Sequence, residues 1–483
     1  MIPLRPADIA EAVAGELLGM SDEALKASSI TSVTVDSRQV VPGTLFVAVA
    51  GERVDGHDFA AEAVAAGAVL ILCARPLHDE AGTPLPCMVV KDPVQALGAL
   101  ASWYRRERLT CTVVAVTGSS GKTTTKDLIA RVLSVAGPTV SARGSFNTEI
   151  GLPLTVLAAD DQTRFLVLEM GMRGVGHIAY LVDLVQPDIA VVLNVGSAHV
   201  GMLGSREAIA AAKAELVQDL PDTAIAVLNE DDGAVRAMGD ITAADVVTFG
   251  ESPSARIRAT DVRLQDAARP AFTLTDERTG DAMPVELRLS GEHYVSNACA
   301  AAAVGRAAGL SMEQIVDALR AAEADSKWRM DVRVSARGFT VINDAYNANP
   351  ESMRAALKSL VAMAAGRRTW AVLGEMRELG DAALEEHDAI GRLAVRLDVS
   401  RLVCVGEGTR VMHLGASSEG SWGEESIHVP DVQAAIDLLN AQVGADDVVL
   451  VKASRAVGLE RVAEALLTEV PEAPRETPQE TSS

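Results

Sequence analysis

The stretch VVAVTGSSGKTTT, at residues 113–125, combines the residue types that binding a phosphate group requires. Gly118 and Gly121 allow a tight turn and a close approach of the backbone to a ligand. Lys122 supplies a positive charge for phosphate oxygens, and Thr123 supplies a hydroxyl that could ligate Mg²⁺. The motif is G-x-x-G-K-T, shorter than the usual phosphate-binding loop because a valine stands where the first glycine would be. This spacing predicts a nucleotide-phosphate site, and a chance glycine turn is the alternative.

Other side chains with metal-ligand chemistry follow two apolar stretches. Glu169 comes directly after Phe165–Leu168, and His199 lies in NVGSAHVG after Ile189–Leu193. A carboxylate at the end of a strand beside a phosphate loop is well placed to hold Mg²⁺, directly or through water, although a surface glutamate is the alternative. His199 is either a metal ligand or a hydrogen-bonded core residue. Lys213 follows three alanines in a predicted helix, and its residue type alone favours a solvated lysine.

A parallel sheet is the element that must position these side chains. The β-branched valines between residues 113 and 116 predict a buried strand, and Thr124–Val135 predicts the helix after the glycine turn. A strand, a glycine turn and a helix N-terminus form an anion site, since N–H groups and the helix dipole both point toward a phosphate. The strands that precede Glu169 and His199 repeat this design, so we expect both residues at the sheet edge that carries the turn.

Length and composition indicate an α/β protein of about three domains. The chain has 483 residues, of which 48% are hydrophobic, and its formal net charge of −23 argues against general binding to nucleic acid or anionic membranes. Five scattered cysteines without a C-x-x-C pair indicate a reducing cytosol. We expect no signal peptide, because charged residues occur early, and no membrane insertion, because the alanine-rich run Asn297–Gly309 is too short to span a bilayer.

The order of predicted elements divides the chain into residues 1–109, 110–324 and 325–470, followed by a polar tail, 471–483, that we expect to be disordered. The third range contains predicted strands at Thr340–Asn343, Thr369–Leu373, Arg401–Val405 and Val448–Lys452, with helical segments between them. This alternation predicts an open, mostly parallel sheet. The glycines of GEMRELG, at residues 374–380, lack the G-x-G-x-x-G spacing of a dinucleotide fingerprint.

Two further loops carry candidate binding residues. In DSRQVV, Ser37 and Arg38 favour either a pocket for a phosphorylated ligand or an ordinary surface loop with a salt-bridged arginine. In NDAYNANPESM, Asn349 can cap a helix that has Pro350 at its first position and Glu351 in its first turn.

Six motifs, taken together and in this order, resemble the Mur ligase family: TGSSGKTTT, FNTEIGLP, EMGMRG, NVGSAHVG, AAKAEL and DAYNANPESM. The resemblance extends through all three ranges, from Asp36–Arg38 to Lys452–Arg455. No single motif would identify the family, whereas six spaced motifs in one order are specific.

The resemblance implies three α/β domains: an N-terminal domain that binds a UDP precursor, a central P-loop-type ATPase domain with a mostly parallel sheet, and a C-terminal Rossmann-like domain. It implies an ATP- and Mg²⁺-dependent ligase of peptidoglycan precursor synthesis, which adds D-alanyl-D-alanine to UDP-N-acetylmuramoyl-tripeptide through an acyl phosphate. We accordingly expect a cytoplasmic monomer with no nucleic-acid partner and no membrane insertion.

By the same resemblance, Lys122, Lys213 and His199 act in catalysis. Mg²⁺ would be held by Thr123, Glu169, His199 and a carbamylated Lys213. Carbamylation needs a neutral amine, and an ordinary lysine with a pKa of about 10.4 is neutral only about once in a few thousand at pH 7. The site must therefore lower the pKa of Lys213.

The resemblance also assigns the remaining binding residues. The UDP group would contact Ser37 and Arg38, the muramoyl peptide would contact Asn147 and Thr148, and His387 is a candidate contact for the dipeptide. ATP would be bound by Gly118, Ser119, Ser120, Gly121, Lys122, Thr123, Thr124, Asn297, Arg329, Asp344, Asn347 and Asn349.

Two alternatives remain open at this point. The first is another ligase, either a sibling that adds a different amino acid or a folylpolyglutamate-type synthetase. The second is a P-loop switch that binds nucleotide without joining two substrates. The shortened loop and the pattern of His199 and Lys213 argue against a switch, and phosphate release that requires both precursor and dipeptide would exclude it.

Overall fold

The computed structural model describes residues 1–51, 54–196, 200–420, 423 and 425–468. The chain forms two compact units, described separately below: one contains Met1–Arg263, Pro270–Arg288 and His293–Ser326, and the other contains Leu264–Arg269, Leu289–Glu292 and the chain from Lys327 onward. The predicted α/β class is confirmed, with three sheets. The domain limits given above stay predictions, and the predicted tail lies outside the described residues. No helix within the described residues is long and apolar enough to cross a membrane.

The first sheet has the strand order β1-β5-β4-β3-β2 and is parallel except for the edge strand β1. Its strands are β1 (Glu16–Leu18), β2 (Ser32–Thr34), β3 (Thr44–Val47), β4 (Ala68–Cys73) and β5 (Cys87–Val89), and the helices are α1 (Pro6–Val13), α2 (Asp22–Ala27) and α3 (Ala60–Ala65). The helix α4 (Pro93–Arg108) follows β5. Tyr104 of α4 accepts the N–H of Ile2 at 2.7 Å and donates to the carbonyl of Ala159 at 2.7 Å, so α4 joins this region to the next.

The second sheet has the order β14-β13-β12-β11-β10-β9-β6-β8-β7. Its strands are β6 (Thr112–Thr117), β7 (Thr139–Ser141), β8 (Phe165–Glu169), β9 (Ile189–Val192), β10 (Ile225–Asn229), β11 (Asp245–Gly250), β12 (Ile257–Gln265), β13 (Arg269–Asp276) and β14 (Asp281–Glu286). The strands from β7 to β12 whose pairings are defined run parallel, and β13 pairs antiparallel with β14. Because β6 lies between β8 and β9, the carboxyl ends of these three strands meet at one edge.

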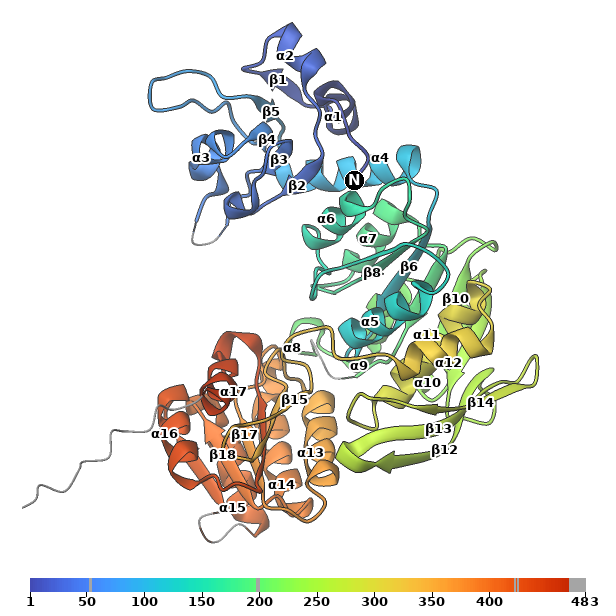
Figure 1. Ribbon diagram of the computed structural model, residues 1–483, viewed down its shortest axis with the longest axis vertical. Coiled ribbons are helices and arrows are strands. Elements are labelled where there is room, and N and C mark those ends of the chain that lie inside the picture. Colours follow the sequence, from blue (N-terminus) through green and yellow to red (C-terminus); the bar gives the residue numbers. More distant parts are fainter. Residues whose placement is uncertain (52–53, 197–199, 421–422, 424, 469–483) are drawn as a thin grey trace, which may run out of the picture. The chain divides into compact units, whose positions relative to one another are not determined.

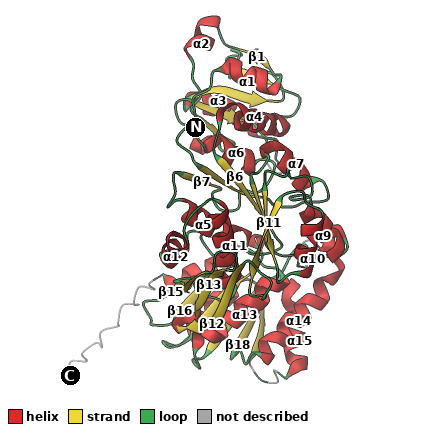
Figure 2. Ribbon diagram, turned by 90° about the vertical axis from the view of Figure 1, so that its right-hand side faces the viewer, coloured by secondary structure: helices red, strands yellow, loops and turns green. Residues whose placement is uncertain are grey.

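Helices cover both faces of the second sheet. Figure 2 shows α5, α11 and α12 on one side of its strands and α7, α9 and α10 on the other. The bounds are α5 (Lys122–Leu133), α6 (Gly151–Ala158), α7 (His177–Val185), α8 (Val200–Leu203), α9 (Arg206–Ala214), α10 (Gly233–Arg236), α11 (Tyr294–Ala307) and α12 (Met312–Arg320). The valines of β6 are fully buried, as the sequence predicts for a strand covered on both faces.

The third sheet has the order β15-β16-β20-β17-β18-β19, and only the edge strand β15 is antiparallel. Its strands are β15 (Asp331–Val334), β16 (Thr340–Asn343), β17 (Thr369–Leu373), β18 (Arg401–Val405), β19 (Ser426–Val429) and β20 (Val448–Lys452). The helices are α13 (Pro350–Ala364), α14 (Ala383–Arg396), α15 (Arg410–Glu419), α16 (Val432–Gln442) and α17 (Glu460–Leu467). The four predicted strands are confirmed. The sequence missed both edge strands, because in each a polar residue separates the two apolar ones, whereas the apolar residues of the central strands are consecutive.

Candidate active site

The phosphate loop, residues 118–122, joins β6 to α5 (Figure 1). Gly121 is the N-cap of α5 and has a φ of +79°, a conformation that favours glycine. The side chain of Asn194, just beyond β9, fastens the loop: its Oδ1 accepts the N–H of Ser120 at 2.9 Å, and its Nδ2 donates to the carbonyl of Ser120 at 3.2 Å. The N–H of Ser119 also donates to the backbone carbonyl of Asn194 at 3.1 Å. The loop is therefore held in shape by the segment that follows β9.

The amine of Lys122, the last residue of the phosphate loop, lies against the first residue of that loop. Its Nζ donates to the carbonyl of Gly118 at 2.7 Å, and the side chain is partly buried. The predicted Thr124 occupies the first turn of α5, one residue after the buried Thr123. These positions place a cation and two hydroxyls at the N-terminus of α5, where the helix dipole favours an anion.

Three side chains from separate segments converge beside the phosphate loop. The hydroxyl of Thr123 donates to Oε2 of Glu169 at 2.8 Å, and Nδ2 of Asn147 donates to Oε1 of the same carboxylate at 2.8 Å. Both Thr123 and Glu169 are 1% exposed. The structure thus brings together a predicted metal pair and a predicted substrate residue. The carbonyl of Thr148, next to Asn147, accepts the N–H of Leu152 in α6 at 3.0 Å.

This cluster has the donor types that Mg²⁺ takes. Among the described residues, no group of three or more His, Cys, Asp and Glu side chains could hold a metal ion. Magnesium, however, commonly binds one or two protein oxygens and completes its shell with water and substrate phosphates. The hydroxyl of Thr123 and the carboxylate of Glu169, beside a phosphate loop, fit that pattern. His199, the other predicted histidine ligand, lies outside the described residues.

Lys213 is buried, contrary to the solvated lysine that its residue type alone favours. Its side chain, near the end of α9, is 1% exposed. Burial, with a smaller effect from the charge of Lys122, lowers the pKa of the Lys213 amine well below its usual range. The amine is therefore disposed to be neutral, as carbamylation requires.

Asn297 places an unsatisfied amide next to the phosphate loop. It lies in α11, which packs against α5, and is 7% exposed. A Cβ at Gly121 would come within 3.0 Å of its Oδ1. Its Nδ2 is buried without a hydrogen-bond partner among the described residues. An unpartnered buried donor costs free energy, so this group suits a ligand that offers an acceptor.

In the second unit, Asp344 and Asn347 surround a buried lysine. The Nζ of Lys452 contacts Oδ2 of Asp344 at 2.6 Å and donates to the carbonyl of Asn347 at 2.8 Å. Oδ1 of Asp344 accepts the N–H of Met330 at 3.1 Å. This network ties the ends of β16 and β20 to the segment before β15.

The other two predicted residues of this unit also have defined partners. The guanidinium of Arg329 lies over the ring of Tyr346, 4.2 Å from its centroid. Asn349 caps α13, since its Oδ1 accepts the N–H of Ser352 at 2.9 Å, and Pro350 occupies the first helical position. The predicted cap is confirmed, whereas the predicted ligand contacts of these residues stay predictions.

Two predicted residues have local structural partners. Arg38 is 84% exposed and forms an ion pair with Asp36 at 2.8 Å, which lowers the pKa of Asp36 to about 2. This is the salt-bridged arginine considered above, with Ser37 beside it at the start of a short 3₁₀ helix, Ser37–Gln39. His387 is buried, and its Nε2 accepts the N–H of Met376 at 2.9 Å. This bond secures the loop after β17.

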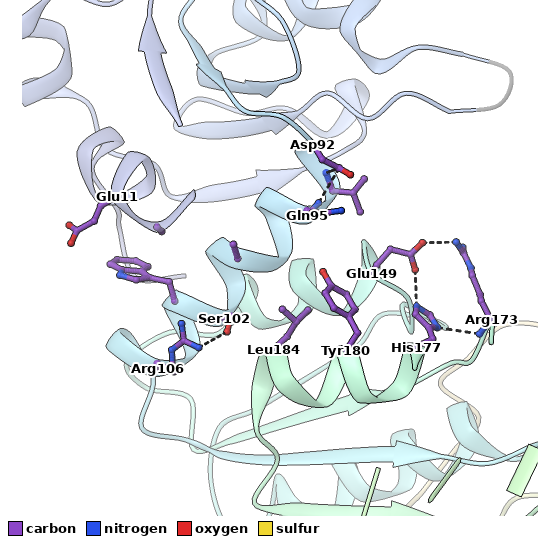
Figure 3. Close-up of a pocket in the computed structure, with 14 residues that line it drawn as sticks. Glu11, Asp92, Gln95, Ser102, Arg106, Glu149, Arg173, His177, Tyr180 and Leu184 are labelled. Carbon is purple, nitrogen blue, oxygen red and sulfur yellow. Dashed lines mark hydrogen bonds and ion pairs between the residues drawn. The ribbon is translucent and has the colours of Figure 1, made fainter. Parts of the chain in front are cut away.

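A pocket of about 1050 Å³ lies along α4 and α7 and does not include the phosphate loop. At one end, Oε1 and Oε2 of Glu149 face Nη1 of Arg173 at 2.5 Å and Nε2 of His177 at 3.1 Å (Figure 3). Nδ1 of His177 accepts the N–H of Arg173 at 3.2 Å. The sequence did not single out these three side chains or the contact of Asn194 with the loop, because each of them has a partner more than twenty residues away in the sequence.

Comparison with known proteins gives three matching family models. The model of the Mur ligase family catalytic domain matches residues 29–105, that of the Mur ligase middle domain matches residues 116–305, and that of the Mur ligase glutamate ligase domain matches residues 328–455. Together they extend over most of the chain.

Two ligases are similar to this chain over nearly the full length of both proteins. UDP-N-acetylmuramoyl-tripeptide–D-alanyl-D-alanine ligase of Mycobacterium tuberculosis is 46% identical, with 97% of this chain and 98% of that protein covered. The ligase of the same name from Escherichia coli is 35% identical, with 96% and 99% covered. A crystal structure of MurF from Acinetobacter baumannii superposes with a TM-score of 0.86 at 30% identity, covering 97% of this chain and 99% of that one. MurF of Thermotoga maritima in complex with ADP gives a TM-score of 0.77 at 29% identity, covering 92% and 98%.

Proposed function

The chain belongs to the Mur ligase family, and on that premise we propose that it joins D-alanyl-D-alanine to UDP-N-acetylmuramoyl-tripeptide with ATP, in peptidoglycan precursor synthesis. The full-length similarity to ligases of that name supports this activity. A cytoplasmic location, a monomeric state and the absence of a nucleic-acid partner belong to the same proposal.

The observation that carries the proposal is the convergence of Thr123, Glu169 and Asn147 beside the phosphate loop. The reaction brings a carboxylate of the tripeptide to the γ-phosphate of ATP, so two anions must meet. Lys122 and the N–H groups at the start of α5 offset the charge of the phosphates. Thr123 and Glu169, with His199, would hold Mg²⁺, which when bound withdraws negative charge from phosphate oxygens. Asn147 orients the carboxylate of Glu169 and, with Thr148, faces the muramoyl peptide.

Lys213 contributes a second anion in this proposal. Its neutral amine adds to the carbon of CO₂, a C–O π pair moves to oxygen, and the nitrogen releases one proton to solvent, which leaves a carbamate. Burial of the amine supports this reaction because it disfavours the protonated form. We expect Lys213→Ala to lose activity and high bicarbonate not to restore it, since the variant has no amine to modify.

The remaining assignments extend the proposal to the nucleotide and the precursor. Asn297 would contact adenine through its unpartnered amide. The UDP group would contact Ser37 and Arg38, with Arg38 exchanging its exposed ion pair for phosphate. Further nucleotide contacts in the second unit would be Arg329, Asp344, Asn347 and Asn349.

A phosphate-release assay with a small panel of substrates tests the proposal. The protein is supplied with ATP, Mg²⁺ and UDP-muramoyl-tripeptide, together with D-alanyl-D-alanine, D-alanine or L-lysine. We expect phosphate release and a coupled product only with the dipeptide. Release with L-lysine in place of the dipeptide would identify a sibling ligase, and release without any acceptor amine would identify a nucleotide switch. Either result would overturn the proposed activity.

A further inference from the structure

The carboxylate of Glu215 joins the end of α9 to the start of α7. Glu215 follows α9 directly and is 7% exposed. Its Oε1 accepts the N–H of Gly176 at 2.6 Å, and its Oε2 accepts the N–H of Ala179 at 3.0 Å. Ionised acceptors form the stronger class of hydrogen bond, and the first turn of a helix favours negative charge. The two N–H donors therefore replace the hydrogen bonds to water that this buried carboxylate has lost.

The cap on α7 comes from a distant part of the chain. The N-cap residue of α7 is Gly176, which has a φ of +84° and no side chain to cap the helix. A serine or aspartate at that position could accept the N–H of Ala179 locally, but it could not accept its own N–H. Glu215 instead reaches them from 36 and 39 residues away, so the contact also fixes α9 against α7.

The segment that carries Lys213 is held at both ends. At the start of α9, Nε of Arg206 donates to the carbonyl of Val195 at 3.0 Å. Beyond the end of α9, Glu215 makes the two bonds described above. Lys213 lies two residues before Glu215, and its long side chain is 1% exposed. The position of its Nζ thus depends on where the last turn of α9 is anchored.

The start of α7 is also tied to the partners of Glu169. His177, the first residue of α7, contacts Glu149 through Nε2 at 3.1 Å (Figure 3). Glu149 lies two residues after Asn147, whose amide donates to Glu169 at 2.8 Å. The first turn of α7 is therefore a common anchor for the segment of Lys213 and for the loop that orients Glu169.

We propose that Glu215 is a positioning residue for Lys213: by binding the N-terminus of α7, it sets the last turn of α9 so that the carbamate of Lys213 forms and is held at the site of Glu169. The inference rests on the proposed function, because it assumes that Lys213 reacts with CO₂. Groups that orient a metal ligand from outside its contact shell commonly change affinity or activity by about 10- to 100-fold when removed.

The test compares Glu215→Gln with a matched control, Asp92→Asn. Asp92 also caps a helix, since its Oδ1 accepts the N–H groups of Val94 and Gln95 at 2.9 and 3.2 Å, and each change removes one negative charge. Full-length proteins are equilibrated with ¹³C-bicarbonate, and the carbamate signal that Lys213→Ala removes is measured by ¹³C NMR. The kcat, the KM for ATP and the dependence of kcat on bicarbonate are measured alongside the melting temperature.

We expect Glu215→Gln to lose most of the carbamate signal and about 10- to 100-fold in kcat, with little change in the KM for ATP and partial recovery at high bicarbonate. Asp92→Asn should change stability without changing carbamate or kcat. A carbamate signal and kcat in Glu215→Gln equal to wild type overturn the inference alone. A wild-type protein that shows no such signal overturns the proposed role of Lys213 and the inference with it. If Glu215→Gln does not fold, Glu215→Asp keeps the charge and shortens the reach, and it must show the same losses to a smaller degree.

Discussion

Removing the side chain of Asn194 should weaken nucleotide binding because this side chain shapes the phosphate loop. The prediction does not require Asn194 to contact the nucleotide. Asn194→Ala deletes the two hydrogen bonds to the backbone of Ser120, at 2.9 and 3.2 Å, that shape the phosphate loop. Each neutral bond contributes about 1 kcal/mol net, so the loop conformation loses about 2 kcal/mol relative to other conformations. When a binding-competent state loses population, the apparent Kd rises in proportion, here by up to about 30-fold.

The assay measures the Kd for ATP by calorimetric titration and kcat/KM by phosphate release. Asn229→Ala is the matched control, because Nδ2 of Asn229 donates to the carbonyl of Leu193 at 2.7 Å, its Oδ1 accepts the N–H of Asp231 at 2.9 Å, and neither bond goes to residues 118–122. We expect both variants to lose stability and only Asn194→Ala to lose affinity. If Asn194→Ala binds ATP with the wild-type Kd, or if Asn229→Ala weakens binding equally, the loop is not held open for phosphate by Asn194.

Three further predictions follow from single residues. Lys122→Ala should lower the rate of phosphate release at least 100-fold, which corresponds to a rise of about 2.7 kcal/mol or more in the activation free energy, because no other phosphate-loop side chain offers a cation. A normal rate would refute the phosphate site. Asn297→Leu should raise the KM for ATP by about tenfold. The melting temperature should stay equal or rise, because the change removes a buried donor that has no partner among the described residues. A lower melting temperature would contradict this prediction. Asp36→Asn should lower the melting temperature at pH 7, and pH-dependent calorimetry should show the deficit shrinking as the pH falls from about 4 toward 2. The folded pKa of Asp36, about 2, lies below its unfolded value, so its stabilisation is complete above the unfolded pKa and is lost through the folded one. A deficit that is constant across that range would show that the ion pair with Arg38 does not stabilise the fold.

Local sequence was sufficient for the central strands and for the chemistry of single motifs. The valines before the phosphate loop, the glycine at φ +79° and the Asn349–Pro350 cap depend on backbone preferences and on neighbours within a few residues. The same holds for the strands β16, β17, β18 and β20, whose apolar residues are consecutive, as in strands buried on both faces. The edge strands β15 and β19 lack that character and were not predicted.

The burial of single side chains and their hydrogen bonds to residues distant in the sequence depended on how the helices and strands pack. From its residue type, Lys213 is a solvated cation, and only the packing of α9 shows that its amine is buried. The pairings of Asn194 with Ser120 and of Glu215 with Gly176 join residues 74 and 39 positions apart. Such contacts follow from the strand order β9-β6-β8 and from the helices laid on that sheet.

The sequence by itself determined that this chain has a phosphate loop on a parallel sheet, because a glycine turn, a lysine and a hydroxyl at fixed spacing are local features. Only the tertiary structure decided which distant side chains shape that loop, orient Glu169 and remove Lys213 from water. The physical reason is that hydrogen bonding and desolvation act between groups that are neighbours in space, and the sequence specifies those neighbours only through the complete fold.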